Sequence, residues 1–412
     1  MLLNRWIETL ATHRDRPAIY EMGEARTFAD LAAAVDARPE ATGPVIAQGS
    51  AFEIAVASLH GWRDGQPVLP IELRDHIPPL PALPGPEIAH LKRVPSNTQH
   101  PRFARFTAAQ IAADADRLVA AMGLTPEIPN LAAISLAHSY GYSNVILPLL
   151  LHGIPIQCVD VPFPASIVAA MKPHARVNLP AVPSMWRAWH RAGILKDAPI
   201  HLALTAGAPL TSQLEQRVWE NDGLKLHNFY GASECGGISW DPTDEPRDLA
   251  DSLGVPLPGV DAQLDEAGHF VIRSSSVAQG YLPDHEADPI IDGSFHTADG
   301  GHLQSGQLIL DARGGEQINV AGRKLGPGRI ESAIQKTGLA EQARIFGVPS
   351  SDPERVDEIA VLLPARTDVD ALRTLLGKSL AGWQLPRHWF IADDSSLWSK
   401  SRTDLRDQFS DS

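Results

Sequence analysis

The 412-residue sequence is poor in cysteine and has no long apolar run, and each shortage excludes a class of protein. Two cysteines, Cys158 and Cys235, are too few for a disulfide framework or a four-thiolate metal site, so we expect a protein of the reducing cytoplasm. A membrane-spanning helix needs about eighteen apolar residues in a row. The nearest approach, residues 144–159, is interrupted by Pro148 and Pro155 and predicts a buried helix followed by a strand.

Basic residues are also few, since the chain has 35 lysines and arginines against 49 acidic residues and a net charge of −14. We find no basic stripe of the kind that holds a nucleic-acid backbone, so nucleic acid is not an expected partner. A small anionic ligand is still possible, because a nest of backbone N–H groups or one bound Mg²⁺ can reverse the local field.

The length favours two or three folding units. Alternating strand and helix patterns predict a parallel sheet covered by helices, with one strong helix capped by Thr107 and ended by Gly123. Short strands follow from about residue 250. We therefore predict an α/β fold with a large domain of layered sheets and helices plus a β-rich subdomain over residues 1–312. A small, mobile α+β domain is predicted over residues 313–412.

One segment, "HNFYGASECGGISW" at residues 227–240, places a single carboxylate, Glu234, between two glycine-bearing turns. Alone it predicts no more than a surface turn after a strand. Six other motifs accompany it along the chain: "LTAGAPL" (204–210), "GVPLPGV" (254–260), "GYL" (280–282), "HTADGG" (296–301), "GRKLGPGRIESAI" (322–334) and "SKSRTDL" (399–405). In order and spacing the set resembles the adenylate-forming superfamily of acyl- and aryl-CoA synthetases, peptide-synthetase adenylation domains and luciferase-type enzymes. The resemblance covers nearly the whole chain, in a short form with a reduced N-terminal part.

The resemblance implies that ATP and Mg²⁺ activate a carboxylic acid as an acyl-adenylate. Carboxylate attack on the α-phosphorus brings negative charges together, so such a site needs a metal, a cation and oriented dipoles. By this resemblance Glu234 is a catalytic residue that helps to hold Mg²⁺, Tyr230 lies against the adenine and Asp299 binds the ribose hydroxyls. The other nucleotide-binding residues that it implies are Gly207, Ala208, Pro209, Gly231, Ser233 and Arg313. An Asx turn is the alternative role for Asp299.

The resemblance implies that Lys400 is the catalytic lysine that bridges the substrate carboxylate and the α-phosphate. A long flexible stem with a point charge suits that task. The match departs from the family at Ser399, where a glycine is usual, and at Ala298 in the Thr-Gly-Asp motif. The alternative for Lys400 is a solvated surface charge.

The largest departure is the loop expected to cradle the β- and γ-phosphates. The family has a glycine-rich loop ending in Pro-Lys, whereas this chain has "VPSNTQHPRF" without glycine. Thr98, Pro101 and Arg102 align with the threonine, proline and lysine of that loop, and Ser96, Asn97 and Thr98 offer polar side chains. Fewer backbone N–H groups can turn inward without glycines, so side chains and the Arg102 guanidinium would have to substitute.

The resemblance also implies an acyl pocket and a path for a thiol. His138 and Tyr140 fall where the family lines its acyl pocket, although a histidine after a buried strand is often only structural. The small residues Gly236 and Gly237 favour a flat ring, and therefore an aromatic or arylalkenoic acid. The remaining implied positions are Gly322 along the pantetheine passage and Gly314 and Gly315 as the hinge of the C-terminal domain.

Two functions follow from these residues. The first is an AMP-forming acid–thiol ligase that transfers the acyl group to CoA or to the phosphopantetheine of an acyl carrier protein, and the sequence does not distinguish these acceptors. The alternative is a non-catalytic protein of the same fold that binds a nucleotide or an acyl ligand, as the glycine-poor loop suggests. A nucleophilic role for Cys235 has little support, because no histidine pattern accompanies it. The oligomeric state is not indicated.

Overall fold

The computed structural model describes most of the chain. The residues that it leaves undescribed are 22, 74–84, 86, 95–101, 250, 267, 285–287, 313–317, 321–322, 326, 351–356, 393–396, 399–401 and 410–412. The chain forms two compact units. Unit 1 comprises residues 1–248, 253–262 and 272–296, and unit 2 comprises residues 249–252, 263–271 and 297–412.

Unit 1 contains a nine-stranded sheet in the order β13-β12-β11-β10-β9-β7-β8-β1-β2. The central strands from β11 to β1 pair in parallel, and the strands at both ends pair antiparallel. The strands are β1 (Pro17–Glu21), β2 (Glu24–Thr27), β7 (Asn130–Ala132), β8 (Ile156–Cys158), β9 (Val177–Ala181), β10 (Ile200–Thr205), β11 (Leu226–Ala232), β12 (Gly236–Trp240) and β13 (Val255–Pro256).

A second sheet of unit 1 has the order β16-β6-β5-β4-β3. Its strands are β3 (Val45–Ala47), β4 (Val68–Pro70), β5 (Ile88–Val94), β6 (Arg102–Thr107) and β16 (Gly280–Leu282). Strand β16 comes from far along the chain and pairs antiparallel with β6, with Tyr281 opposite Ala104. This pairing brings the "GYL" motif next to the strand that follows the predicted phosphate loop.

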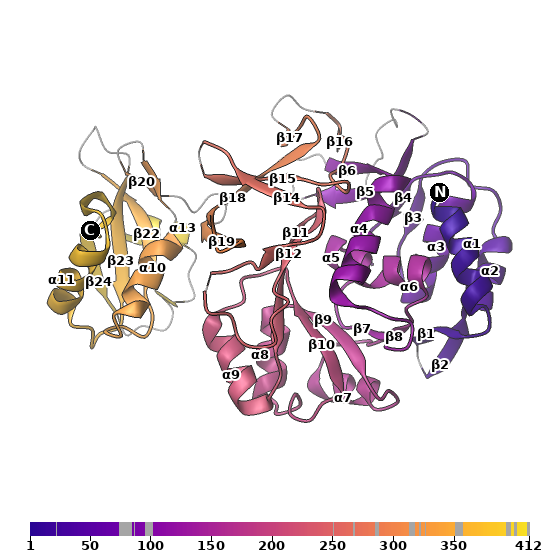
Figure 1. Cartoon of the computed structure of the whole chain (residues 1–412), viewed down its shortest axis with the longest axis horizontal. Coiled ribbons are helices and arrows are strands. Elements are labelled where there is room, and N and C mark those ends of the chain that lie inside the picture. Colours follow the sequence, from indigo (N-terminus) through magenta and orange to yellow (C-terminus); the bar gives the residue numbers. More distant parts are fainter. Residues whose placement is uncertain are drawn as a thin grey trace. The chain divides into compact units, whose positions relative to one another are not determined.

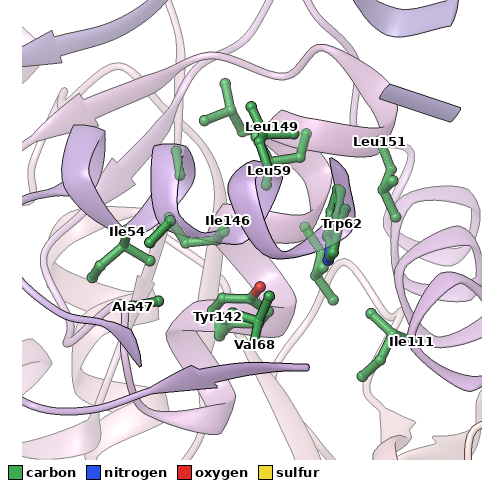
Figure 2. Packing of buried hydrophobic residues seen from close by; sticks show 14 of the residues in the cluster. Ala47, Ile54, Leu59, Trp62, Val68, Ile111, Tyr142, Ile146, Leu149 and Leu151 are labelled. Carbon is green, nitrogen blue, oxygen red and sulfur yellow. The ribbon is translucent and has the colours of Figure 1, made fainter. Parts of the chain in front are cut away.

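Helices cover the sheets of unit 1 (Figure 1). They are α1 (Leu2–His13), α2 (Phe28–Asp36), α3 (Ala51–Arg63), α4 (Ala108–Met122), α5 (Ser139–Gly141), the π-helix η1 (Tyr142–Ile146), α6 (Leu147–His152), α7 (Pro164–Met171), α8 (Pro183–Arg191) and α9 (Ser212–Asp222). Figure 2 shows the largest core, where Ile54, Leu59 and Trp62 of α3 face Tyr142 and Ile146 of η1. Burial of this apolar surface is the main favourable term in folding.

Unit 2 is an α+β unit with its own core. Strands β22, β23 and β24 form a three-stranded sheet, and apolar side chains of α10, α11 and α13 pack on it. The elements are β19 (Gln307–Ala312), β20 (Ile318–Val320), β21 (Arg323–Leu325), α10 (Pro327–Lys336), β22 (Arg344–Pro349), β23 (Asp357–Leu363), α11 (Val369–Ser379), the 3₁₀ helix η2 (Gly382–Gln384), β24 (His388–Ile391) and α13 (Arg402–Phe409). The β-rich part of the chain also includes β14 (Asp261–Leu264), β15 (His269–Arg273), β17 (Ile290–Ile291) and β18 (Ser294–Gln304).

The α/β fold class is confirmed. The predicted helix caps are confirmed too, because the Thr107 side chain accepts from Gln110 N and Gly123 ends α4 with φ +60°. The predicted domain boundary at residue 313 stays a prediction, since residues 313–317 lie outside the described chain and compact unit 2 begins its longest stretch at Thr297. In the part of the chain that the structure describes, no helix is long and apolar enough to cross a membrane.

Candidate active site

Three of the predicted segments meet at one edge of the nine-stranded sheet. Strands β7, β9, β10 and β11 are parallel neighbours, so their carboxyl ends lie on the same side. The segment at His138 follows β7, the one at Gly207 follows β10 and the turn at Glu234 follows β11. Ser139 Oγ donates to Ser233 Oγ at 2.9 Å and joins the first of these segments to the last. Ligands of open α/β sheets bind at this edge.

Glu234 lies in the tight turn between β11 and β12. Gly236 has φ +73°, in the left-handed region, and a Cβ on Gly231 would lie 2.7 Å from the Gly236 carbonyl oxygen. Both positions therefore require glycine. The backbone of the turn is tied to the segment before β16, because Ala278 N donates to the Glu234 carbonyl at 2.8 Å.

The Glu234 carboxylate accepts a hydrogen bond from a residue that the sequence analysis did not assign. Tyr281 Oη donates to Glu234 Oε1 at 3.1 Å. Burial raises the pKa of Glu234 above its usual 4.5, while the Tyr281 hydroxyl and the charges of Lys92 and Arg102 act in the opposite direction. Burial and the neighbouring carboxylate raise the pKa of Tyr281, so the phenol remains protonated and donates.

Arg102, the predicted phosphate-binding cation, begins β6 and is held on two sides. Its guanidinium forms an ion pair with Asp288 and lies over the Tyr281 ring, with Cζ 4.4 Å from the ring centroid. Both side chains of the ion pair are largely covered, with 23% of Arg102 and 12% of Asp288 exposed. Arg102 and Glu234 thus share Tyr281 as a common neighbour.

Two further charged side chains are buried behind this turn, on β5 and α4. Lys92 is 4% exposed, donates to Ser143 Oγ at 3.3 Å and lies over the Phe106 ring. Asp114 is 2% exposed; its Oδ1 accepts from Gly237 N at 2.9 Å, and its Oδ2 has no hydrogen-bond partner among the described residues. Burial lowers the pKa of Lys92 below its usual 10.5, although Asp114, Cys235 and Glu234 oppose this change.

The predicted acyl side is closely packed. Tyr140 stacks on Phe229, with 6.0 Å between ring centroids, and its hydroxyl donates to the Leu204 carbonyl at 3.1 Å. A Cβ on Gly236 would lie 2.2 Å from Asp114 Oδ1, and one on Gly237 would lie 2.7 Å from Leu257 Cδ1. The two glycines therefore let other side chains pack against β12. Their role beside an acyl group stays a prediction.

The remaining predicted nucleotide-binding residues have varied settings. Gly207, Ala208 and Pro209 form an exposed loop after β10, where Gly207 has φ +80°. Tyr230 is 8% exposed within β11. In unit 2, Asp299 lies on β18, and its backbone N–H donates to Thr297 Oγ1 at 3.2 Å. This bond involves the Asp299 main chain, so both the Asx-turn role and the ribose-binding role of its carboxylate stay predictions.

A divalent metal at the unit 1 site would be held by the Glu234 carboxylate, because Asp288 pairs with Arg102 and Asp114 is buried behind the turn. The described residues include no group of three histidine, cysteine or acidic side chains able to hold a metal ion. Mg²⁺ is commonly bound through one or two carboxylates together with substrate phosphates. Glu234, a hard oxygen donor beside a phosphate-binding candidate, fits that mode. Glu234 would then hold a metal that also contacts the phosphates of a nucleotide.

Several predicted residues lie outside the described chain: Ser96, Thr98, Arg313, Gly314, Gly315, Gly322 and Lys400. Sequence reasoning missed Tyr281, Asp288 and Lys92. The "GYL" motif was a signal for Tyr281, since it belongs to the motif series. No pattern in the sequence distinguishes Lys92 or Asp288 from surface charges.

The fold and site define a class: proteins of the adenylate-forming fold, with a parallel sheet, a glycine-bearing turn that carries one acidic residue and a following β-rich region. The family model "AMP-binding enzyme" matches residues 101–282, which include Arg102, Glu234 and Tyr281. Residues 101–282 of the chain are therefore similar to the AMP-binding enzyme family.

Curated proteins and solved structures that are similar to the chain include acid–CoA ligases. A long-chain-fatty-acid–CoA ligase of Salmonella typhimurium is 30% identical over 235 residues, which are 52% of this chain and 41% of the relative. A salicylyl-CoA synthase / salicylate adenylyltransferase of a Streptomyces species is 25% identical over 319 residues, 71% of this chain and 57% of the relative. The matches thus span about half the length of these relatives. The crystal structure of apo MatB from Rhodopseudomonas palustris has the same fold, with TM-score 0.80, 19% identity and coverage of 100% of this chain and 99% of that chain.

Proposed function

We propose that the protein is an ATP-dependent ligase that joins a carboxylic acid to a thiol through an acyl-adenylate. The observation that carries the proposal is the meeting of Glu234 and Arg102 on one tyrosine, Tyr281, at the carboxyl edge of the parallel sheet. A carboxylate and a guanidinium in this arrangement suit a polyphosphate with its divalent cation. The match of residues 101–282 to the AMP-binding enzyme family model supports the same function.

In the first step a substrate carboxylate oxygen attacks the α-phosphorus of ATP. The bond from that phosphorus to the oxygen bridging to the β-phosphate breaks, and pyrophosphate leaves with the electron pair. Arg102 binds phosphate oxygens and Glu234 holds Mg²⁺, which, when bound, neutralises charge on the phosphates. Lys400 binds the substrate carboxylate and the α-phosphate together. In the second step a thiol sulfur attacks the acyl carbon and AMP leaves.

The proposed acid is aromatic or arylalkenoic, and the proposed acceptor is CoA or a carrier-protein phosphopantetheine. The name of the salicylate relative supports an aromatic acid. Both cysteines are free thiols, which agrees with our proposal of a cytoplasmic location. Burial raises the pKa of the Cys235 thiol, and the charges of Glu234 and Asp114 raise it further, so Cys235 is a poor nucleophile.

The test is pyrophosphate release with a panel of aromatic and fatty acids, run with CoA and with a carrier protein from the same source. We expect release that depends on a carboxylic acid and is abolished in Lys400→Ala while ATP binding, measured by calorimetry, persists. Release by Lys400→Ala at the wild-type rate would contradict the assigned role of Lys400. Absence of release with every acid would remove support for the ligase.

A non-catalytic nucleotide- or acyl-binding protein is the second candidate. The observation that favours it is the ion pair between Arg102 and Asp288, which neutralises the predicted phosphate-binding cation. Calorimetry with ATP and with an acyl-sulfamoyl adenosine separates the candidates. Tight binding of the adenylate analogue that weakens in Glu234→Ala and Asp299→Ala supports the ligase, whereas ATP binding without acid-dependent pyrophosphate release supports the second candidate.

A further inference from the structure

The Tyr281 side chain contacts both Glu234 and Arg102. Its hydroxyl donates to Glu234 Oε1 at 3.1 Å, and its ring lies 4.4 Å from the Arg102 guanidinium carbon. The side chain is 2% exposed and belongs to the main core of unit 1. Tyr281 therefore lies between a carboxylate and a cation for which the sequence analysis predicts metal and phosphate binding.

The backbone around Tyr281 is fixed from both sides. Strand β16 pairs with β6, where Tyr281 lies opposite Ala104, and Arg105 Nη1 donates to the Tyr281 carbonyl at 3.1 Å. Just before β16, Ala278 N donates to the Glu234 carbonyl at 2.8 Å. The same strand therefore anchors the main chain of the Glu234 turn and the start of β6. The tyrosine ring has little freedom to leave its position.

The chemistry of the phenol suits this task better than that of a charged residue. A protonated phenol donates to a carboxylate and orients it without neutralising its charge, so the carboxylate still attracts a divalent cation. The face of the ring attracts a guanidinium through its quadrupole and adds no second anion. Lysine or aspartate at this position would disturb one of the two contacts.

We infer that Tyr281 is a positioning residue that holds the Glu234 carboxylate and the Arg102 guanidinium at a fixed separation for a metal-bound polyphosphate. The inference rests on the proposed function, because it assumes that Glu234 and Arg102 bind a nucleotide and its metal. The inference assigns Tyr281 no direct contact with the metal or the nucleotide. Its effect passes through the two residues that it touches.

The test separates the hydroxyl from the ring. Tyr281→Phe removes the hydrogen bond to Glu234 and keeps the ring under Arg102, whereas Tyr281→Leu removes both. The control is Tyr142→Phe, since Tyr142 is equally buried and its hydroxyl donates to Ser58 Oγ at 2.9 Å, within the core shown in Figure 2. All variants are made in the full chain, and their thermal unfolding is recorded beside that of the wild type.

The measurement is the dissociation constant of a non-hydrolysable ATP analogue by calorimetry, in Mg²⁺ and in EDTA. We expect Tyr281→Phe to bind about tenfold more weakly in Mg²⁺, the size of one lost hydrogen bond to a charged group, and to be unchanged in EDTA. Tyr281→Leu is expected to bind the analogue more weakly than the wild type both in Mg²⁺ and in EDTA. Tyr142→Phe is expected to bind it like the wild type in both conditions. Electron paramagnetic resonance of bound Mn²⁺, recorded in the presence of the analogue, is expected to rank the affinities of the variants in the same order. It needs no activity assay.

Two results would overturn the inference and leave the proposed function standing. One is a Tyr281→Phe variant that binds the analogue like the wild type in Mg²⁺. The other is a Tyr281→Phe variant that weakens equally in Mg²⁺ and EDTA, as general loosening of the site would produce. A wild-type protein whose nucleotide binding ignores Mg²⁺ also overturns it. A wild type that binds no nucleotide in either condition overturns the inference and the proposed function together.

Discussion

Lys225 and Lys92 are both buried lysines of unit 1, and their surroundings differ. Lys225 Nζ donates to Glu215 Oε1 and to Asp241 Oδ2, each at 2.6 Å, and Arg247 Nε donates to Glu215 Oε2 at 2.8 Å. Lys92 forms no ion pair with any described residue; its contacts are the Ser143 hydroxyl and the face of Phe106. One lysine lies in a cluster of matched charges, and the other is a lone cation.

This difference separates a structural cluster from a site. The carboxylates around Lys225 have further donors, such as Thr243 Oγ1 at 2.6 Å from Asp241 Oδ1, so no charge there needs a ligand. Near Lys92, Glu234 has a neutral donor and Asp114 Oδ2 has no hydrogen-bond partner among the described residues. Incomplete pairing of buried charge is typical of functional sites. The contrast predicts opposite responses to mutation.

The largest effect is expected for Lys225→Met. Removal of the ammonium leaves Asp241 and Glu215 buried with too little positive charge, and loss of one partner from a buried ion pair costs about 3–5 kcal/mol. Urea unfolding followed by fluorescence of the buried Trp186 and Trp189 of unit 1 measures the change. The control is Lys172→Met, an exposed position after α7, with an expected change within about 0.5 kcal/mol. A urea midpoint of Lys225→Met equal to that of Lys172→Met would show that Lys225 is not a structural charge, and would contradict the contrast with Lys92.

An intermediate effect is expected for Asp288→Asn on ligand binding. The Asp288 carboxylate forms an ion pair with the Arg102 guanidinium. A phosphate that binds Arg102 must therefore compete with the negative charge of Asp288. We expect Asp288→Asn to bind tripolyphosphate about fivefold more tightly by calorimetry, a gain of about 1 kcal/mol. If this ion pair were permanent, as at Lys225, the variant would instead lose stability without any gain in affinity.

The matched control for that variant lies in the same segment. Asp284 pairs with Arg105 at 2.9 Å, and its side chain is 71% exposed. Surface ion pairs contribute little, so Asp284→Asn is expected to bind tripolyphosphate like the wild type. Equal tightening in both variants would indicate a general change in charge rather than release of Arg102.

The sequence predicted much of the secondary structure that carries these charged residues. Regular alternation of strands and helices, with cap residues such as Thr107 and Gly123, is a local signal, and the structure confirms it. The parallel sheet was predicted as well, and in the structure its parallel strands bring the segments at His138, Gly207 and Glu234 to one edge. These features depend on short stretches of chain, which a single sequence displays directly.

The contacts of the site depend on pairings that no local pattern displays. Tyr281 reaches Glu234 across 47 residues because β16 adds to the edge of β6. Lys92 in "IAHLKRV" resembles a solvent-facing strand residue, but β5 lies between β4 and β6 and α4 packs nearby, so the side chain is covered. The glycines at 236 and 237 indicated open space, and only the packing places Asp114 and Leu257 beside them.

The smallest effect, and the finest test of the comparison, is expected for Lys92→Met. Methionine replaces a desolvated cation by an apolar side chain of similar size, and no ion pair is broken, so we expect a stability change within about 1 kcal/mol near neutral pH. The pH dependence carries a sign. Because burial lowers the pKa of Lys92 below 10.5 in the folded protein, the unfolded chain binds a proton that the folded chain lacks between the two pKa values. Wild-type stability relative to Lys92→Met therefore rises with pH through that window and levels off above 10.5.

The charged and titratable groups that act on Lys92 are Asp114 from α4 and Glu234 and Cys235 from the turn, and neutral His90 lies on the same strand. The double variant Lys92→Met/Asp114→Asn isolates the nearest of these partners, because asparagine keeps an acceptor for Gly237 N. We expect it to be more stable than the sum of the single changes predicts, since the lysine and the carboxylate stabilise each other across the core. Urea midpoints at several pH values from 7 to 10.5 measure both quantities. A Lys92→Met loss as large as that of Lys225→Met, or a wild-type advantage that falls as pH rises, would mean that Lys92 is a paired structural charge after all.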